Sequence, residues 1–226
     1  MSRTTARTAL ILALLLSAAG AANALDVGEL NLHLGQAWIG NGYTTDADGE
    51  PVQGSDVSPL NFTGAFGVDL EFAPRVRFAP TLFLYWQEYL ETPSGKAVPT
   101  QIETGTAAGN IAGSLGLILS MPYIYEWSLS EELAVLAGAS PSVVLRLPAQ
   151  PIEGSELNGL YEYFFSEARF LQPELMGSFL YRLNETVRFG LNLRVFFPVH
   201  NLWTQYEVEF FDEAMILPNL ELRLSP

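Results

Sequence analysis

Most of the chain alternates between large apolar side chains and small or polar ones. A β-strand places successive side chains on opposite faces, so this period of two predicts strands with one apolar face. The alternating segments number eight, and they span residues 30–38, 62–72, 76–86, 111–121, 133–147, 171–182, 187–195 and 216–224. Several of them are longer than the usual strand of a soluble protein.

The connections between these segments alternate in length. Long connections cover residues 40–61, 87–108, 148–167 and 198–213, and short ones cover residues 73–75, 126–131 and 183–185. In an up-and-down barrel, odd connections lie at one end and even connections at the other. One end then has long loops and the other has tight turns, as in outer-membrane barrels. The sequence therefore predicts an all-β fold, an eight-stranded antiparallel up-and-down transmembrane β-barrel.

Proline occurs inside the alternating segments at Pro80, Pro141, Pro173 and Pro218. Proline removes a donor from the hydrogen-bond ladder and is usually found at sheet edges or bulges. Because a closed barrel has no edge, we expect bulges or local breaks in the strands at these positions.

Side-chain size indicates which face of the strands points outward. One face is built from Leu, Phe, Val, Trp and Ile, and the other is rich in Gly, Ala and Ser with occasional charges. The lumen of an eight-stranded barrel is narrow and just fills with side chains, so the small residues suit the inside. The large apolar face is then expected to contact lipid, at Phe62, Phe66, Leu70, Leu84, Leu117, Leu119, Phe189, Leu191, Leu193 and Leu222.

The small-residue face also carries most of the arginines, together with several carboxylates. A buried charge needs a partner. If Pro74 is the centre of the turn at residues 73–75, Glu71 lies opposite Arg77. If Asn184 is the centre of the turn at residues 183–185, Glu174 lies opposite Arg194. We predict both as ion pairs in the lumen. The other charges expected in the lumen are Asp69, Arg146, Arg182, Arg188, Glu221 and Arg223.

Residues 1–24 have the layout of a secretory signal peptide. Arg3 and Arg7 give a positive start, the apolar stretch ALILALLL follows, and Ala22-Asn23-Ala24 is a small-x-small cleavage site. An uncleaved anchor is the alternative, but the apolar run is short of the ~20 residues that a membrane span needs. We therefore expect cleavage near Ala24 and a barrel domain over residues 25–226.

Composition and charge narrow the function classes. The chain has 226 residues, with 25 acidic against 11 basic ones, which argues against nucleic-acid binding because that needs a basic surface. It has no Cys, which excludes a disulfide scaffold, a Cys-ligated metal site, a thiol nucleophile and a lipid-modified N-terminal Cys. Its single lysine, Lys96, lies in a predicted loop, whereas a water-exposed surface is usually rich in Lys.

Residues able to carry out chemistry are few. His33 and His200 are the two histidines, and a buried structural histidine is the simpler interpretation of His33. Residues 46–50 resemble a fragment of a calcium loop but lack the later bidentate acid, so a polar turn is the simpler interpretation. We expect no catalytic residue, no metal site and no cofactor.

Two of the long connections carry aromatic side chains with strand parity. Tyr161, Tyr163 and Phe165 share one parity, and residues 206–210 show the same pattern. The strands are expected to project beyond the membrane at these places. Exposed aromatics there, with Trp203, would bind a partner or contact lipid headgroups, and hairpins packing on each other are the alternative.

In these features the chain resembles the small eight-stranded outer-membrane β-barrels of diderm bacteria, of the OmpA-transmembrane, OmpX and OmpW type. The resemblance covers residues 25–226 and rests on the alternating segments and the rhythm of the connections. It implies an outer-membrane location, contact with outer-membrane lipid and insertion by the barrel-assembly machinery. These families commonly end in a strand with a terminal aromatic, whereas this chain ends in Leu224-Ser225-Pro226.

The leading hypothesis is a non-enzymatic outer-membrane barrel with a structural or adhesive role, its loops meeting an extracellular partner, or with a path for small apolar solutes. An apolar pocket with a lateral gap between strands would favour passage, and a solid ionic plug would favour the structural role. A soluble periplasmic lipocalin-like binder of an apolar ligand stays open and requires the Leu and Phe face to turn inward. An outer-leaflet lipid-modifying hydrolase also stays open and requires His33 or His200 within hydrogen-bond reach of a Ser or an acid.

Overall fold

The structure is a computed structural model, and it describes residues 27–40, 43–45, 51–53, 61–91, 95–100, 110–151, 157–204 and 213–225. The predicted signal peptide, the acidic segment at residues 46–50 and the aromatic stretch at residues 206–210 lie outside the described residues.

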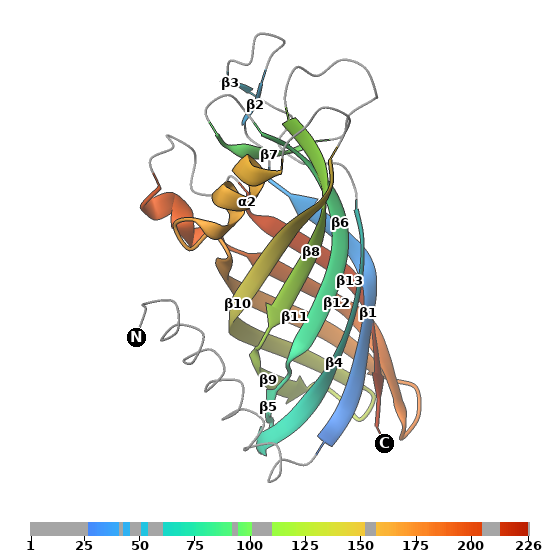
Figure 1. The fold of residues 1–226 in the computed structure, drawn as a ribbon. Helices are drawn as coiled ribbons and strands as arrows, with labels where there is room; N and C mark the ends of the chain where they lie inside the picture. The colour runs from blue at the N-terminus through green and yellow to red at the C-terminus, as the bar shows by residue number, and fades with distance from the viewer. Residues whose placement is uncertain are drawn as a thin grey trace, which may run out of the picture.

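Long antiparallel strands close into a barrel (Figure 1). In chain order they are β1 (Val27–Ile39), β4 (Asn61–Ala73), β5 (Val76–Phe78) with β6 (Thr81–Glu91), β8 (Asn110–Ser120) with β9 (Tyr123–Ser128), β10 (Leu133–Pro151), β11 (Leu171–Arg182), β12 (Val187–Phe196) and β13 (Met215–Leu224). Strand β13 returns to pair with β1, so that Leu30 lies opposite Leu224 and Ile39 opposite Met215. With β5–β6 and β8–β9 each taken as one interrupted strand, the ring has eight strands, which confirms the predicted fold class.

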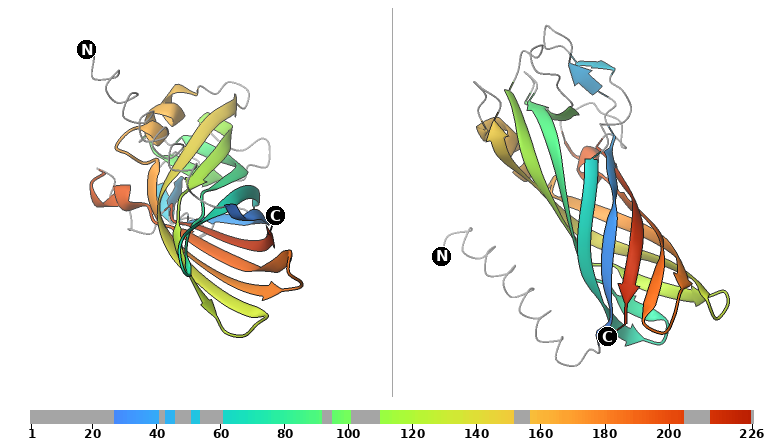
Figure 2. Two further views of the ribbon diagram at one scale, coloured as in Figure 1. Left: turned by 90° about the horizontal axis from the view of Figure 1, so that it is seen from below. Right: turned by 90° about the vertical axis from the view of Figure 1, so that its right-hand side faces the viewer.

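The two ends of the barrel differ. At one end, called here the tight-turn end, short turns join β4 to β5, β9 to β10 and β11 to β12, and the C-terminus lies beside them (Figure 1). The other end, the loop end, carries the small elements β2 (Tyr43–Thr45), β3 (Pro51–Gln53), β7 (Ala97–Thr100), α2 (Asn158–Phe165) and the 3₁₀ turn η2 (Val199–Leu202). Figure 2 shows from the side that the strands are tilted against the long axis. None of the helices in the described part of the chain is long and apolar enough to cross a membrane.

The prolines affect the strands unequally. Pro80 separates β5 from β6, which confirms the expected break at that position, and Pro122 separates β8 from β9 in the same way. The two breaks are neighbours, because the Ala79 N–H donates to the Pro122 carbonyl at 3.0 Å. At Pro218 the expectation of a break or bulge is wrong on one side of β13, which keeps one register with β12, and holds on the other side, where the pairing with β1 skips Leu217 and Pro218.

The expectation is also wrong at Pro141 and Pro173, which lie directly opposite each other in the continuous pairing of β10 with β11. The missing N–H of Pro173 is directed toward β12, since its carbonyl accepts the Phe197 N–H at 2.8 Å, just past the last residue of that strand. Pro141 lies beside the break between β8 and β9. Each proline therefore faces a place where the neighbouring strand already stops, and the ladder loses little.

The apolar face of the strands points outward. Of the ten side chains predicted to contact lipid, Phe62, Phe66, Leu84, Phe189, Leu191 and Leu193 are exposed, and Leu70, Leu117, Leu119 and Leu222 are partly buried on the same outer wall. Small and charged residues alternate with them and point into the lumen. A lipocalin-like binder needs the opposite orientation, so the structure contradicts that alternative.

Candidate functional site

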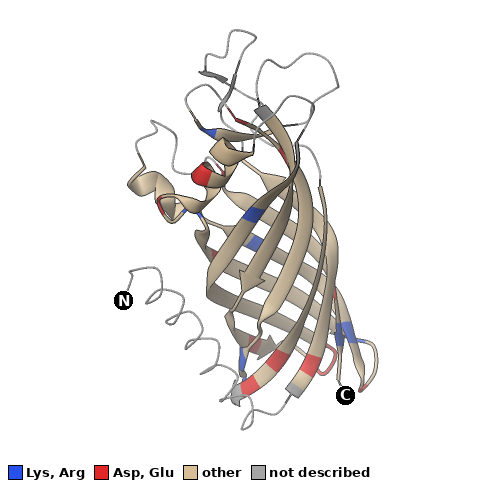
Figure 3. Cartoon of the chain, in the orientation of Figure 1, with Lys and Arg blue, Asp and Glu red and all other residues tan. Residues whose placement is uncertain are grey.

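A cluster of charged side chains fills the lumen near the tight-turn end, where Figure 3 shows Asp, Glu and Arg gathered on the strand ends. This tight-turn cluster consists of Glu29, Asp69, Arg77, Glu126, Arg188, Glu221 and Arg223. Apart from Arg77, which is half-buried, every member is buried. The members come from β1, β4, β5, β9, β12 and β13, so the cluster ties strands from around the ring together across the lumen.

The arginines bridge carboxylates that lie on different strands. The Arg77 guanidinium donates to Glu29 Oε2 at 2.8 Å and lies 3.0 Å from Glu126 Oε2. Arg188 contacts the same two carboxylates, with Nη1 donating to Glu126 Oε1 at 3.0 Å. Arg223 binds Asp69, and its Nη2 lies 2.6 Å from Glu221 Oε1. Charge-assisted bonds of this kind are stronger than neutral ones and hold the geometry that makes burial of the charges tolerable.

The predicted ion pair between Glu71 and Arg77 is wrong, although the two residues do lie opposite each other in the pairing of β4 with β5. The register of β4 with β5 shifts between Glu71 and Ala73, and the register of β1 with β4 shifts between Val27 and Glu29. These irregularities leave the Glu71 side chain exposed and bring Glu29 to the arginine instead. The alternating segment that begins at Leu30 does not include Glu29, so the sequence pattern does not predict its place in the lumen.

The place of Glu126 is not predicted either, because the sequence pattern puts this residue in the short connection at residues 126–131. The structure continues the strand through it as β9, and its side chain enters the lumen beside Arg188. A strand that resumes after Pro122 could be found from the alternation of Tyr123, Tyr125 and Trp127, which are exposed, with buried Ile124 and Glu126.

A matched pair of substitutions tests which carboxylate belongs to the cluster. Glu29→Gln removes the charge that Arg77 and Arg188 share, so we expect a loss of about 1.5–3 kcal/mol in the free energy of unfolding. Glu71→Gln lies outside the cluster, and we expect a change within about 0.5 kcal/mol. Urea unfolding of the barrel in lipid vesicles measures both. Equal effects of the two substitutions would contradict the assignment.

Glu174 and Arg194 form an ion pair in the middle of the lumen, with Oε1 and Nη1 2.7 Å apart. They are not opposite each other, however, because the register places Arg194 opposite Met176. The turn is centred on Glu185, and Asn184 accepts the N–H groups of Thr186 and Val187. The two charged side chains therefore meet diagonally.

The lumen around this pair is closely packed. Ser120 and Ser142 donate to Glu174 Oε2 at 2.5 and 2.7 Å. The guanidinium of Arg194 lies 4.7 Å from the centre of the Phe83 ring, where a cation–π contact is favourable. The acid accepts several hydrogen bonds and the base is stacked, so both charges are satisfied away from water.

Arg182 does not lie in the lumen as predicted. It is exposed at the end of β11, directly opposite Arg188. Arg188 occupies the lumen position beside Glu29 and Glu126, and a second arginine opposite it would be repelled. Asp69, Arg146, Arg188, Glu221 and Arg223 are all buried inside the barrel.

The loop-end half of the lumen is filled mainly by apolar side chains, including Phe83, Ile118 and Phe196. Arg146 lies among them, with Nη1 3.9 Å from Glu213 Oε2 and its guanidinium 5.6 Å from the centre of the Phe164 ring. In the described part of the chain, this half is therefore mainly an apolar core around the buried Arg146, and the other half is an ion network.

Helix α2 packs on this core at the loop end. The strand expected at Tyr161, Tyr163 and Phe165 is wrong, because these residues lie in the helix. Leu160, Tyr163 and Phe164 are the buried positions, and their spacing of three and four residues is helical. The period-two pattern of the aromatics concealed that spacing.

The hydroxyl of Tyr163 donates to the Glu213 carboxylate. Burial raises the pKa of the Tyr163 phenol well above its ordinary value, and the negative charge of Glu213 adds to the effect. Tyr163 therefore stays protonated and keeps donating, which fixes the helix to the chain segment that leads into β13.

In the described part of the chain, each histidine lies near a carboxylate but beyond hydrogen-bond length from it. His200 Nε2 lies 3.8 Å from Glu213 Oε2, and His33 Nε2 lies 4.0 Å from Glu221 Oε1. Both separations exceed hydrogen-bond length. Among the described residues, no group of His, Asp and Glu side chains could hold a metal ion.

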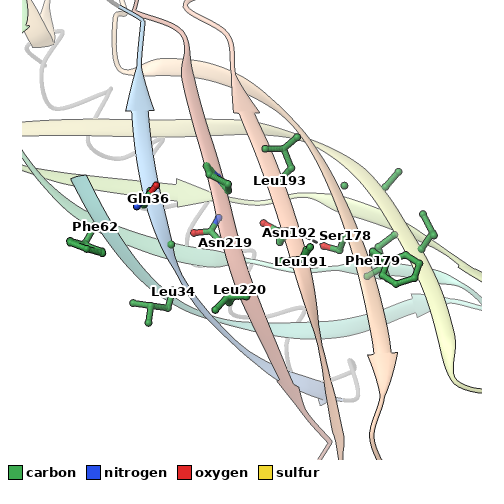
Figure 4. A pocket seen from close by; sticks show the side chains of 16 residues that line it. Leu34, Gln36, Phe62, Ser178, Phe179, Leu191, Asn192, Leu193, Asn219 and Leu220 are labelled. Atoms are coloured by element: carbon green, nitrogen blue, oxygen red, sulfur yellow. Dashed lines mark hydrogen bonds between the residues drawn. The ribbon is translucent and has the colours of Figure 1, made fainter. Parts of the chain in front are cut away.

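Two grooves on the described barrel wall are lined mainly by apolar side chains. The larger, about 990 Å³, crosses β1, β13, β12 and β11, with Leu34, Leu220 and Leu191 along it (Figure 4). The smaller, about 580 Å³, is lined by the facing prolines Pro141 and Pro173 together with Phe197 and Val199, where β12 has ended.

No family model matches the chain, and no curated protein matches it in sequence. Among solved structures, the chain is similar to neisserial surface protein A, with 9% identity, coverage of 89% of this chain and 99% of that one, and a TM-score of 0.48. It is similar to the outer membrane protein OprG from Pseudomonas aeruginosa (10% identity, 88% and 97% coverage, TM-score 0.47). It is also similar to the attachment invasion locus protein Ail of Yersinia pestis (8% identity, 88% and 99% coverage, TM-score 0.39). In architecture the chain is a small eight-stranded antiparallel β-barrel.

Proposed function

We propose that this protein is an integral outer-membrane β-barrel of a diderm bacterium, without enzymatic activity, whose sealed lumen holds a rigid platform for its long connections. On this proposal its role is structural or adhesive. The observation that carries it is the filling of the described lumen, by the tight-turn cluster at one end and by the apolar core beneath α2 at the other.

The outer wall supports insertion into a membrane. Bulky apolar side chains cover it, and Phe62 is 78% exposed. In water such a belt would be a large apolar patch prone to aggregation, whereas acyl chains remove that penalty. Strand β13 pairs with β1 and closes the ring, and a closed barrel is the form in which a β-sheet can span hydrocarbon.

Aromatic side chains lie near both ends of this wall. Tyr125 and Trp127 are exposed near the tight-turn end, and Trp38 and Trp86 are exposed toward the loop end. Such belts suit the two membrane interfaces. We propose that the protein is exported through its signal peptide and inserted by the barrel-assembly machinery, with the loop end outside the cell.

A second candidate role, passage of small apolar solutes, is favoured by the smaller groove. The groove lies on the outer face of the wall, where Pro141 is opposite Pro173. Its lining includes Ser140 and Glu174, whose side chains point into the lumen. A solute could leave laterally into the membrane there if the packing behind the prolines yielded.

Reconstitution into planar lipid bilayers separates the two roles. A sealed barrel is expected to show no stable ion-conducting steps, because the arginine–carboxylate bridges cross the lumen. Stable conductance by the unaltered protein would overturn the sealed platform.

Vesicle uptake of a small apolar dye tests the second role, with Pro141→Trp filling the smaller groove and Leu183→Trp, at the exposed turn after β11, as the matched control. Uptake lost in the first variant and kept in the second would replace the structural role by lateral passage. No uptake above that of protein-free vesicles supports the sealed platform.

A further inference from the structure

Large apolar side chains are exposed beyond the strands at the loop end. Tyr161 and Phe165 lie on α2, and Leu202 and Trp203 lie at the end of η2; these residues are called here the outer shelf. Leu202 is 71% exposed and Trp203 52%. Leu202 is more exposed than any leucine of the outer wall in the described part of the chain, although the closure of the barrel does not require it.

The shelf has a defined structure. The Trp203 indole N–H donates to the carbonyl of Glu167 at 2.8 Å, which joins η2 to the turn that follows α2. On α2, the rings of Tyr161 and Phe165 stack with their centres 6.3 Å apart, and the Tyr161 hydroxyl donates to the Pro148 carbonyl at 2.7 Å. The Tyr161 hydroxyl and the Trp203 indole N–H thus both have hydrogen-bond partners within the protein. Their rings can therefore enter an apolar medium without losing a hydrogen bond.

The height of the shelf matches the edge of the hydrocarbon layer. Strand β11 runs from exposed Leu171, beside the shelf, to Tyr181 at the tight-turn end. Ten residues rising about 3.4 Å each, at a tilt of about 40°, span about 26 Å, close to the ~25 Å apolar band of membrane barrels. With Tyr181 at one interface, Leu171 reaches the other.

The outer shelf adjoins the outer wall, because the chain connects its two elements to strands β11 and β12. Leu171 and Leu175 of β11 are exposed on that wall. The Leu171 N–H donates to the Ala168 carbonyl at 2.9 Å, next to the residue that holds Trp203. Phe197 and Pro198 join β12 to η2, and the Phe197 N–H donates to the Pro173 carbonyl.

We infer that the outer shelf lies in the outer leaflet, at the boundary between headgroups and acyl chains, and anchors the loop end there. The partner is a lipid surface, and short helical elements with an exposed apolar side suit this interface. The inference rests on insertion of the barrel into a membrane, and it adds a lipid contact made by the connections in addition to that of the strands.

Fluorescence quenching by brominated lipid tests it. The full chain is refolded into phosphatidylcholine vesicles, with Trp38, Trp86 and Trp127 replaced by Phe so that Trp203 alone emits. We expect strong quenching by bromine placed near the headgroup end of the acyl chain, weaker quenching by bromine at the chain terminus, and little quenching by aqueous iodide. Strong iodide quenching without lipid quenching would overturn the inference.

Trp127 provides the control for insertion. A variant that keeps Trp127 alone reports on β9 at the other interface, so lipid quenching of Trp127 without quenching of Trp203 refutes the shelf while leaving the barrel in the membrane. If the triple replacement does not fold, the difference in quenching between the unaltered protein and Trp203→Phe gives the same answer. If the two proteins differ only in their quenching by iodide, the inference is contradicted. If they differ only in their quenching by bromine near the headgroups, it is supported.

Discussion

Replacing Arg223 by Ala is expected to destabilise the folded barrel by about 3–5 kcal/mol, because removal of one partner leaves buried charges uncompensated. Arg223 is buried, binds Asp69 and contacts Glu221 with both Nε and Nη2. Asp69 and Glu221 are also buried. Alanine leaves these two carboxylates buried in a narrow lumen with their principal cation gone.

The measurement is urea unfolding of the barrel in lipid vesicles, followed by the mobility difference between folded and unfolded chains. Arg182→Ala is the matched control, because Arg182 is an exposed arginine at the same end, and a change within about 0.5 kcal/mol is expected. Adding Glu221→Gln to Arg223→Ala should recover part of the loss, since one uncompensated charge is removed. An Arg223→Ala barrel as stable as the Arg182→Ala barrel would show that the cluster does not hold the lumen closed.

Replacing Leu191 by Arg is expected to cost about 2–4 kcal/mol, the penalty for a cation on the lipid face of a barrel near the bilayer centre. Leu191 lies in the middle of β12, between outward-facing Phe179 of β11 and Leu220 of β13. Its side chain contacts no lumen charge, so the expected penalty comes from the surrounding medium.

Leu183→Arg is the control that isolates the medium. Leu183 is 62% exposed and Leu191 63%, but Leu183 lies in the turn between β11 and β12, outside the apolar band. In water the two substitutions should be equally mild. In lipid vesicles the Leu191 variant should be much less stable than the Leu183 variant, and equal stabilities would contradict a lipid-facing wall.

Alternation of side chains was enough to predict the strands and their outward face, because burial on one side imposes a period of two along every strand. Phe62, Leu84 and Leu191 follow that rule directly. The break at Pro80 also follows from local chemistry. The continuous strands at Pro141 and Pro173 do not, because they depend on where β8 and β12 stop, which is a property of neighbouring strands.

The ion pairs could be predicted only in part. Glu174 and Arg194 meet because they share the lumen face, but the register differs by two residues, since Asn184 caps the turn with its side chain and does not centre it. Glu71 loses its place to Glu29 through shifts in register at the strand ends. Long arginine side chains reach across several strands, so partner choice in a narrow lumen depends on the closed ring.

The most direct test of the central claim, that the bulky apolar face meets acyl chains around a filled lumen, is a nitroxide scan along β12. Single cysteines are introduced at Phe189, Gly190, Leu191, Asn192 and Leu193, labelled and measured in lipid vesicles for collision with oxygen and with a water-soluble nickel chelate. We predict high oxygen collision at 189, 191 and 193, and low collision with both reagents at 190 and 192. Frequent collision with the nickel chelate at 189, 191 and 193 would contradict the lipid-facing wall. Frequent collision with it at 190 and 192 would contradict the filled lumen.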